Sequence, residues 1–204
     1  NRRRCLAGLT GVGYGRARKQ TRIIQQPSNT QKIVVLNPKG GSGKSTVATN
    51  LAAYYAWKGL RVALMDMDSQ GSSIRWLKVR PSECPAIHPI AAYEQRMGVT
   101  RSFALRAPPG TERLIVDTPA ALTALQMSDV VRDASAIVVP VLPSDIDIHA
   151  ASRCIADLLL VAKIKRAENR IGVIANRVRK NTLMFQSLMR FLEKTFMLQV
   201  IDHH

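Results

Sequence analysis

The chain has 204 residues, of which 46% are hydrophobic and only 5% aromatic, and it carries a formal net charge of +16. These values predict one globular domain with an aliphatic core, because single domains commonly span roughly 100–200 residues. No apolar run approaches the about 20 residues that a membrane-spanning helix needs, so we expect a soluble, cytoplasmic protein with no integral membrane segment. The three cysteines are widely spaced, which argues against a disulfide framework and against a C-x-x-C metal site.

The first part of the chain is basic and shows neither helix nor strand periodicity. Residues 1–32 contain eight Lys or Arg side chains and no Asp or Glu. Scattered glycines and a polar run at 25–31 favour disorder. We therefore divide the chain into a basic, disordered tail at 1–31 and one folded domain at 32–204. That domain is expected to be truncated at its C-terminus, because the chain stops directly after a strand-like run.

From Lys32 onward, short β-branched runs alternate with longer amphipathic stretches. Expected strands lie at 33–37, 62–66, 114–117, 136–141 and 171–176, with a further candidate at 197–201. Expected helices lie at about 44–58, 122–133, 147–163 and 182–195. Buried strands separated by helices favour parallel pairing, so the predicted fold is α/β, a doubly wound, mostly parallel sheet flanked by helices. The proline-rich segment 71–112 is the least regular, with one short strand expected at 89–93.

A glycine-rich loop follows the first expected strand and opens the first expected helix. It reads Lys39-Gly40-Gly41-Ser42-Gly43-Lys44-Ser45-Thr46, and Pro38 stands where the usual Gly-x-x-x-x-Gly-Lys-[Ser/Thr] pattern begins. The glycines let backbone N–H groups turn toward a phosphate at a helix N-terminus, where the helix dipole also favours anions. Lys44 supplies a positive charge for the β- and γ-phosphates, and the Ser45 hydroxyl is placed to bind Mg²⁺. The alternative is a glycine turn that precedes a helix without binding a nucleotide.

Acidic side chains follow two of the expected strands. Asp66 and Asp68 lie at the end of the strand at 62–66, and Asp117 ends the strand at 114–117. The carboxyl ends of parallel strands form the crevice in which doubly wound sheets bind ligands. We expect Asp66 and Asp68 to alternate along an extended backbone and reach the same side, one supporting the Mg²⁺ shell and the other orienting a water. Asp117 has the form of a Walker B carboxylate, which reaches Mg²⁺ through water.

Two features lie in the last third of the chain. Asn176 ends the strand expected at 171–176, and its amide could hydrogen-bond the edge of a nucleotide base or cap a following helix. Between Arg153 and Lys194 there are ten Lys or Arg side chains and three acids. Such an excess favours binding to nucleic acid through phosphate neutralisation. A solvated basic face that binds nothing is the alternative.

Together these motifs resemble the deviant Walker A ATPases, the family that includes ParA and MinD. The resemblance extends from about Lys32 to the C-terminus, and its form is closer to ParA because Asp68 is followed by Ser-Gln-Gly. It implies that Lys39 reaches the ATP phosphates of a partner subunit, that Asp68 positions the attacking water and that Asn176 lies at the adenine. The resemblance thus implies catalytic residues Asp68, Lys39 and Lys44, metal ligands Ser45, Asp66 and Asp117, and nucleotide contacts at Lys39, Gly40, Gly41, Ser42, Gly43, Lys44, Ser45, Thr46 and Asn176.

The function implied by this resemblance is slow, Mg²⁺-dependent ATP hydrolysis used as a switch. ATP would close two subunits into a homodimer that binds nonspecific DNA on the nucleoid, and a ParB-like or cargo-adaptor protein would trigger hydrolysis. The cargo could be a plasmid, a chromosome or a protein organelle. Three alternatives remain at this point. They are a MinD-like membrane-cycling regulator, an ATP-gated DNA-binding scaffold without hydrolysis, and a reductase of the nitrogenase iron protein type, which would need paired cysteines.

Overall fold

The computed structural model describes residues 30–94, 106–165, 168, 170–179 and 182–196. Six parallel strands form one sheet in the order β3-β2-β4-β1-β5-β6. The strands are β1 (Gln31–Val35), β2 (Val62–Asp66), β3 (Ile87–Ala91), β4 (Arg113–Asp117), β5 (Ala136–Val141) and β6 (Ile171–Ala175). Because β1 lies inside the sheet and later strands are added on both sides of it, the loop that follows β1 emerges near the middle of one sheet edge.

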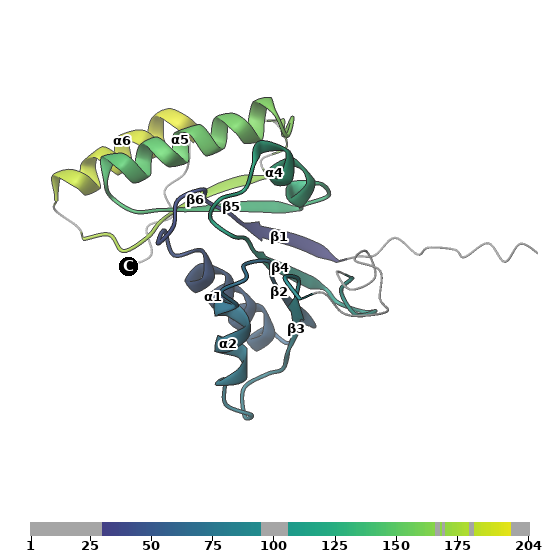
Figure 1. Ribbon diagram of the computed structural model, residues 1–204. Coiled ribbons are helices and arrows are strands. Elements are labelled where there is room, and N and C mark those ends of the chain that lie inside the picture. The colour runs from purple at the N-terminus through teal and green to yellow at the C-terminus, as the bar shows by residue number, and fades with distance from the viewer. Residues whose placement is uncertain (1–29, 95–105, 166–167, 169, 180–181, 197–204) are drawn as a thin grey trace, which may run out of the picture.

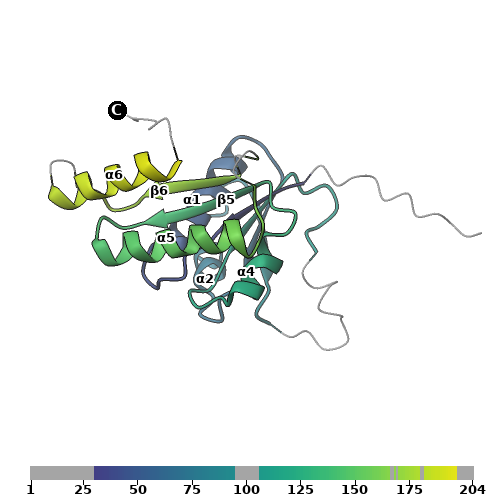
Figure 2. The same ribbon diagram turned by 90° about the horizontal axis from the view of Figure 1, so that it is seen from above.

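Helices cover both faces of the sheet. Helices α1 (Lys44–Trp57) and α2 (Ser72–Lys78) lie on one face (Figure 1). The other face is covered by α4 (Ala124–Val131), α5 (Asp145–Leu160) and α6 (Leu183–Phe196), and α5 and α6 lie side by side in both views (Figure 2). This three-layer arrangement is the predicted doubly wound fold, which the structure confirms.

Successive residues of the central strands supply two separate cores. Val34 belongs to the core that includes Leu158 of α5, whereas its neighbours Ile33 and Val35 belong to the core that includes Ala52 of α1. Side chains alternate between the two faces of a strand, so a strand covered on both faces must be apolar at every position. This is why the strands appear in the sequence as continuous aliphatic runs.

The structure places most elements within a few residues of their expected positions, and it adds one helix. Strands β2 and β5 have the expected bounds, and β3 begins two residues earlier than expected. The short strand expected within 71–112 is present as β3, but the sequence reasoning expected no helix there, and α2 occupies Ser72–Lys78. The candidate strand at 197–201 and the expected tail, apart from its last two residues, lie outside the described residues.

The described cysteines behave as core or half-buried thiols. Cys154 on α5 is buried, and burial raises its pKa to about 12. Cys84 is half-buried, and neither is in a disulfide. A thiol that stays protonated in an aliphatic core is a packing residue.

Candidate nucleotide-binding site

The glycine-rich loop lies between β1 and α1, where its first residues are attached to a neighbouring strand. The buried Asn37 side chain accepts from the Lys39 N–H at 2.8 Å and donates through Nδ2 to the Pro140 carbonyl at 2.7 Å. Gly41 and Gly43 have φ values of 77° and 93°, in the left-handed region that a side chain disfavours. The loop therefore enters α1 through a backbone shape that requires glycine. The sequence interpretation did not assign this anchoring role to Asn37.

Lys44 is the first residue of α1 and is almost fully buried. Its Nζ donates to the Lys39 carbonyl at 3.1 Å, so the ammonium group is held against its own loop. Burial lowers the pKa of Lys44, and the nearby carboxylates of Asp117 and Asp68 oppose that change. A desolvated cation that lies beneath a loop of backbone N–H groups is suited to an anionic ligand such as a phosphate.

Asp117 ends β4 directly beside Asp66, because the two residues are paired across β2 and β4. Its Oδ2 accepts from the Ser73 hydroxyl at 2.6 Å. Its Oδ1 is buried and has no hydrogen-bond partner among the described residues. Burial raises the pKa of Asp117, opposed by the hydroxyls of Ser73 and Ser45 and by Lys44. An orphaned carboxylate oxygen close to Ser45 and Lys44 fits a group that brings its own positive charge.

Asp66 is turned toward the start of α2. Its Oδ2 accepts from the N–H groups of Ser73 at 2.9 Å and Ile74 at 3.2 Å, and its Oδ1 accepts from the Asp68 N–H at 3.1 Å. Burial raises the pKa of Asp66, and these backbone hydrogen bonds oppose the rise. Gly71 provides no side-chain cap for α2, so the Asp66 carboxylate stabilises those N–H groups instead. A place for Asp66 in a metal shell stays a prediction.

Asp68 lies in a turn rather than on a strand. The expectation that Asp66 and Asp68 alternate along an extended backbone is wrong, because β2 ends at Asp66 and the chain then turns toward α2. The Asp68 Oδ1 accepts from the Gln70 N–H at 3.0 Å, which stabilises this turn. Asp68 is nevertheless close enough to Lys44 to affect its pKa. The turn thus brings Asp68 to the same edge as the glycine-rich loop.

Asn176 follows β6 and contacts the glycine-rich loop. Its Nδ2 donates to the Ser42 carbonyl at 3.0 Å, and a Cβ atom added to Gly43 would lie 2.1 Å from that nitrogen. Asn176 is not a helix cap, because α6 begins seven residues later at Leu183. Its amide therefore supports the loop backbone, while a contact with a nucleotide base stays a prediction.

The remaining predicted residues also surround this loop. Gly40, Gly41 and Thr46 are exposed, and Ser45 is half-buried. The buried Ser42 Oγ has no hydrogen-bond partner among the described residues. Lys39 extends to α5, where its Nζ lies 2.7 Å from Oδ2 of Asp147. All of the predicted site residues thus lie at one sheet edge, together with three that the sequence did not single out, Asn37, Ser73 and Asp147.

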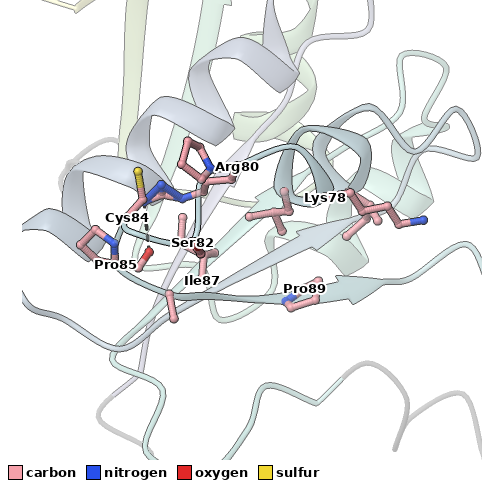
Figure 3. A pocket seen from close by; sticks show the side chains of 11 residues that line it. Lys78, Arg80, Ser82, Cys84, Pro85, Ile87 and Pro89 are labelled. Carbon is pink, nitrogen blue, oxygen red and sulfur yellow. Dashed lines mark hydrogen bonds between the residues drawn. The ribbon is translucent and has the colours of Figure 1, made fainter.

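A pocket of about 370 Å³ lies elsewhere, between α2, the segment after it and β3 (Figure 3). Arg80, Cys84, Pro85 and Ile87 are among the residues that line it, and Arg80 Nη2 donates to the Pro85 carbonyl at 3.1 Å. None of the predicted nucleotide-binding residues lines this pocket. A phosphate loop binds its ligand through exposed backbone N–H groups rather than in an apolar pocket. The glycine-rich loop therefore remains the candidate nucleotide site.

Comparisons with known proteins show which family the chain belongs to. In the described part of the chain, no helix combines the length and the apolar character needed to cross a membrane. Maintenance of carboxysome distribution protein A from Halothiobacillus neapolitanus is 27% identical over 162 residues, which cover 79% of this chain and 73% of that protein. Two further curated relatives match over 51% and 21% of their own length.

Solved structures share the fold at low sequence identity. A plasmid partition protein from Borrelia burgdorferi bound to AMPPNP has a TM-score of 0.62 at 16% identity, covering 80% of this chain and 81% of that one. Cobyrinic acid a,c-diamide synthase from Mycobacterium smegmatis with ADP and magnesium has a TM-score of 0.61 at 20% identity, covering 85% of each chain. The family model for the CobQ/CobB/MinD/ParA nucleotide binding domain matches residues 33–203. The chain therefore belongs to the CobQ/CobB/MinD/ParA nucleotide-binding domain family.

Proposed function

We propose that this chain is a ParA-type ATPase whose ATP-bound homodimer binds DNA nonspecifically and positions a cargo. The observation that carries the proposal is the arrangement of Lys39, Lys44, Asp68 and Asp117 around one glycine-rich loop. An ordinary P-loop needs only the lysine at position 44, whereas a second lysine ahead of the glycines, here Lys39, matches the ParA pattern. The relative named for carboxysome distribution and the plasmid partition structure support positioning as the task, with a protein organelle or a plasmid as cargo.

The residues at the sheet edge fit Mg-ATP. The loop N–H groups and Lys44 would hold the phosphates, and Ser45 with the orphaned Oδ1 of Asp117 would hold Mg²⁺. Mg²⁺, when bound, neutralises charge on the phosphates. Asp68 would orient the attacking water, because its Oδ1 is fixed by the Gln70 N–H at the same edge. We expect slow basal hydrolysis that a ParB-like or adaptor protein accelerates.

Lys39→Ala is expected to leave ATP binding within about threefold of the wild type and to abolish ATP-dependent dimerisation. The reason is that Lys39 extends away from its own loop, with its ammonium at α5, whereas Lys44 remains in the loop to bind phosphates. Equilibrium binding of a fluorescent ATP analogue and sedimentation velocity with ATP measure the two effects. Loss of ATP binding equal to that of Lys44→Ala would contradict a role for Lys39 across the interface.

A basic surface on the α5–β6–α6 side of the molecule supports DNA binding. Six exposed cations lie on α5 or α6 or in the segments before and after β6, with no ion pair to a described carboxylate, and Arg170 is paired with Glu168. The six are Arg153, Lys163, Lys165, Arg177, Arg179 and Arg190. Closing two subunits would place two such surfaces on one rigid particle, which raises the effective concentration of the second for the same DNA. Nonspecific binding that needs ATP follows from this avidity.

Binding to nonspecific duplex DNA is expected to be strong only with ATP. It should weaken steeply as salt rises, because binding releases counterions from the DNA. Arg177→Ala combined with Arg179→Ala should reduce the salt slope by about two, which is about one per lost phosphate contact. The matched control is Arg75→Ala combined with Lys78→Ala, two exposed cations of α2 on the opposite face of the sheet. Fluorescence anisotropy in ATP, ADP and no nucleotide, across a salt series, measures both quantities.

Deleting residues 1–29 separates the contribution of the basic tail to DNA binding from that of the folded domain. The deletion stops there because the Gln31 N–H donates to the Glu112 carbonyl at 2.9 Å and Gln31 begins β1. The shortened chain should bind DNA more weakly but with the same dependence on ATP. Identical binding curves in all three nucleotide states would contradict the switch and leave a basic protein that adheres to DNA.

A further inference from the structure

The ion pair between Lys39 and Asp147 joins the glycine-rich loop to the start of α5. Lys39 Nζ lies 2.7 Å from Asp147 Oδ2, and the two residues are 108 positions apart in the chain. The Lys39 side chain is 36% exposed, whereas the Asp147 side chain is 3% exposed. The other three ion pairs among the described residues have a more exposed acid, so this pair is the one with a buried carboxylate.

Helix capping explains part of the position of Asp147 but not its pairing with Lys39. Ser144 caps α5, and the Asp147 N–H donates to Ser144 Oγ at 3.2 Å, while the Ser144 hydroxyl donates back to Asp147 Oδ2. An acid in the first helical turn is stabilised by the backbone N–H groups without any lysine. Asp145 in the same turn is exposed and has no ion pair with a described cation.

Because Asp147 is buried, its carboxylate depends on Lys39, the one cation that pairs with it among the described residues. Its Oδ1 is buried with no hydrogen-bond partner among the described residues, so the carboxylate relies on Lys39 and Ser144 at Oδ2. Removing the cation from a buried pair leaves an uncompensated charge, which is strongly unfavourable. Moving Lys39 away from Asp147 toward another subunit therefore costs free energy.

We propose that Asp147 is a positioning residue that holds Lys39 within its own subunit and opposes dimerisation until ATP phosphates compete for the lysine. The inference rests on the proposed function, in which Lys39 reaches a partner subunit's nucleotide. One ammonium group does not serve both anions, so each subunit gives up its Lys39–Asp147 pair when the dimer closes. Loss of the phosphates favours return of Lys39 to Asp147, and this return helps the dimer to open.

Asp147→Asn keeps the shape of the side chain and removes the charge that attracts Lys39. We expect about a tenfold gain for each released lysine, and therefore about a hundredfold lower dissociation constant for the ATP-bound dimer, because a dimer releases two. Sedimentation velocity of the full chain over a range of protein concentrations, with a nonhydrolysable ATP analogue, measures this constant. Asp145→Asn is the matched control and should leave it unchanged. An unchanged or weaker dimer in Asp147→Asn would overturn the inference.

Failure of the inference and failure of the proposed function give different results. If Lys39→Ala still dimerises with ATP, the role of Lys39 across the interface is wrong, whatever Asp147 does. If Lys39→Ala abolishes dimerisation but Asp147→Asn does not strengthen it, only the holding role of Asp147 is wrong. The double variant should not dimerise, because the gain from Asp147→Asn requires the lysine.

The reactivity of lysine amines in the wild-type chain supplies a test that needs no substituted variant. In the nucleotide-free wild type, acetylation of Lys39 by a limiting amount of acetic anhydride should be at least about fivefold slower than that of the exposed Lys58, because the Lys39 amine is held against the buried Asp147 carboxylate and is less accessible to the reagent. Mass spectrometry of the digested chain measures both rates, and the ATP analogue should change the Lys39 rate alone. Equal rates for the two lysines in the nucleotide-free protein would overturn the proposal even if Asp147→Asn does not fold.

Discussion

Lys44→Ala is expected to weaken ATP binding at least about a hundredfold, which corresponds to roughly 2.7 kcal/mol of lost charge-assisted hydrogen bonding. Lys44 is the first residue of α1, and its Nζ lies against the loop at the Lys39 carbonyl. Alanine has good helix propensity, so α1 should still form while the loop loses its cation. Isothermal titration calorimetry with ATP and Mg²⁺ measures the loss.

The control for this variant lies at the other end of the same helix. Lys58 is exposed and caps the C-terminus of α1, and its Nζ lies 5.6 Å from the centre of the Tyr54 ring, far from the loop. Lys58→Ala should therefore bind ATP like the wild type. If Lys44→Ala binds ATP as tightly as Lys58→Ala does, the glycine-rich loop is not the phosphate site.

Asp68→Ala is expected to lower ATP turnover at least about a hundredfold while leaving ATP binding largely intact, because positioned acid–base groups commonly contribute factors of this size. Orienting a water affects the transition state more than the bound ground state, so the variant should accumulate as an ATP-bound dimer. Phosphate release under saturating ATP measures turnover, and sedimentation measures the dimer.

Asp129→Ala is the matched control for Asp68→Ala. Asp129 is an exposed carboxylate on α4 that pairs with Arg132, and its loss should leave turnover unchanged. Turnover in Asp68→Ala at the wild-type rate would remove Asp68 from the chemistry. If the wild type itself shows no hydrolysis above background, even with a partner protein, the ATP-gated scaffold becomes the better description.

Much of the fold was predictable because the sheet is buried on both faces. The run at β2 is apolar up to its last residue, Asp66, and the run at β5 is apolar throughout; an apolar run bounded by polar residues indicates a covered parallel strand. Helix α2 was not predictable in the same way. It has only seven residues, its N-cap is Gly71, and the carboxylate that stabilises its first N–H groups belongs to Asp66 in β2. A cap supplied by a preceding strand leaves no local capping pattern.

The loop residues of the site were predictable because a phosphate loop is continuous in sequence. The residues that support it come from distant elements. Ser73 contacts Asp117 across 44 positions, and Asn176 contacts Ser42 across 134. Asp147 resembles an ordinary acid in a first helical turn, and only the three-dimensional structure shows that it is buried against Lys39. Contacts between residues so far apart depend on the topology of the chain and not on the spacing of residues in the sequence.

The outermost strand β3 has a consequence for assembly. Its third residue is Pro89, which has no N–H group, and both Pro89 and the preceding His88 are exposed at this border of the sheet. A proline in a border strand interrupts the ladder that a neighbouring chain would need to continue the sheet. Because Pro89 lacks a backbone N–H donor, hydrogen bonding of a second sheet to β3 is disfavoured. This border of the sheet is therefore poorly suited to fibre-like growth by strand addition.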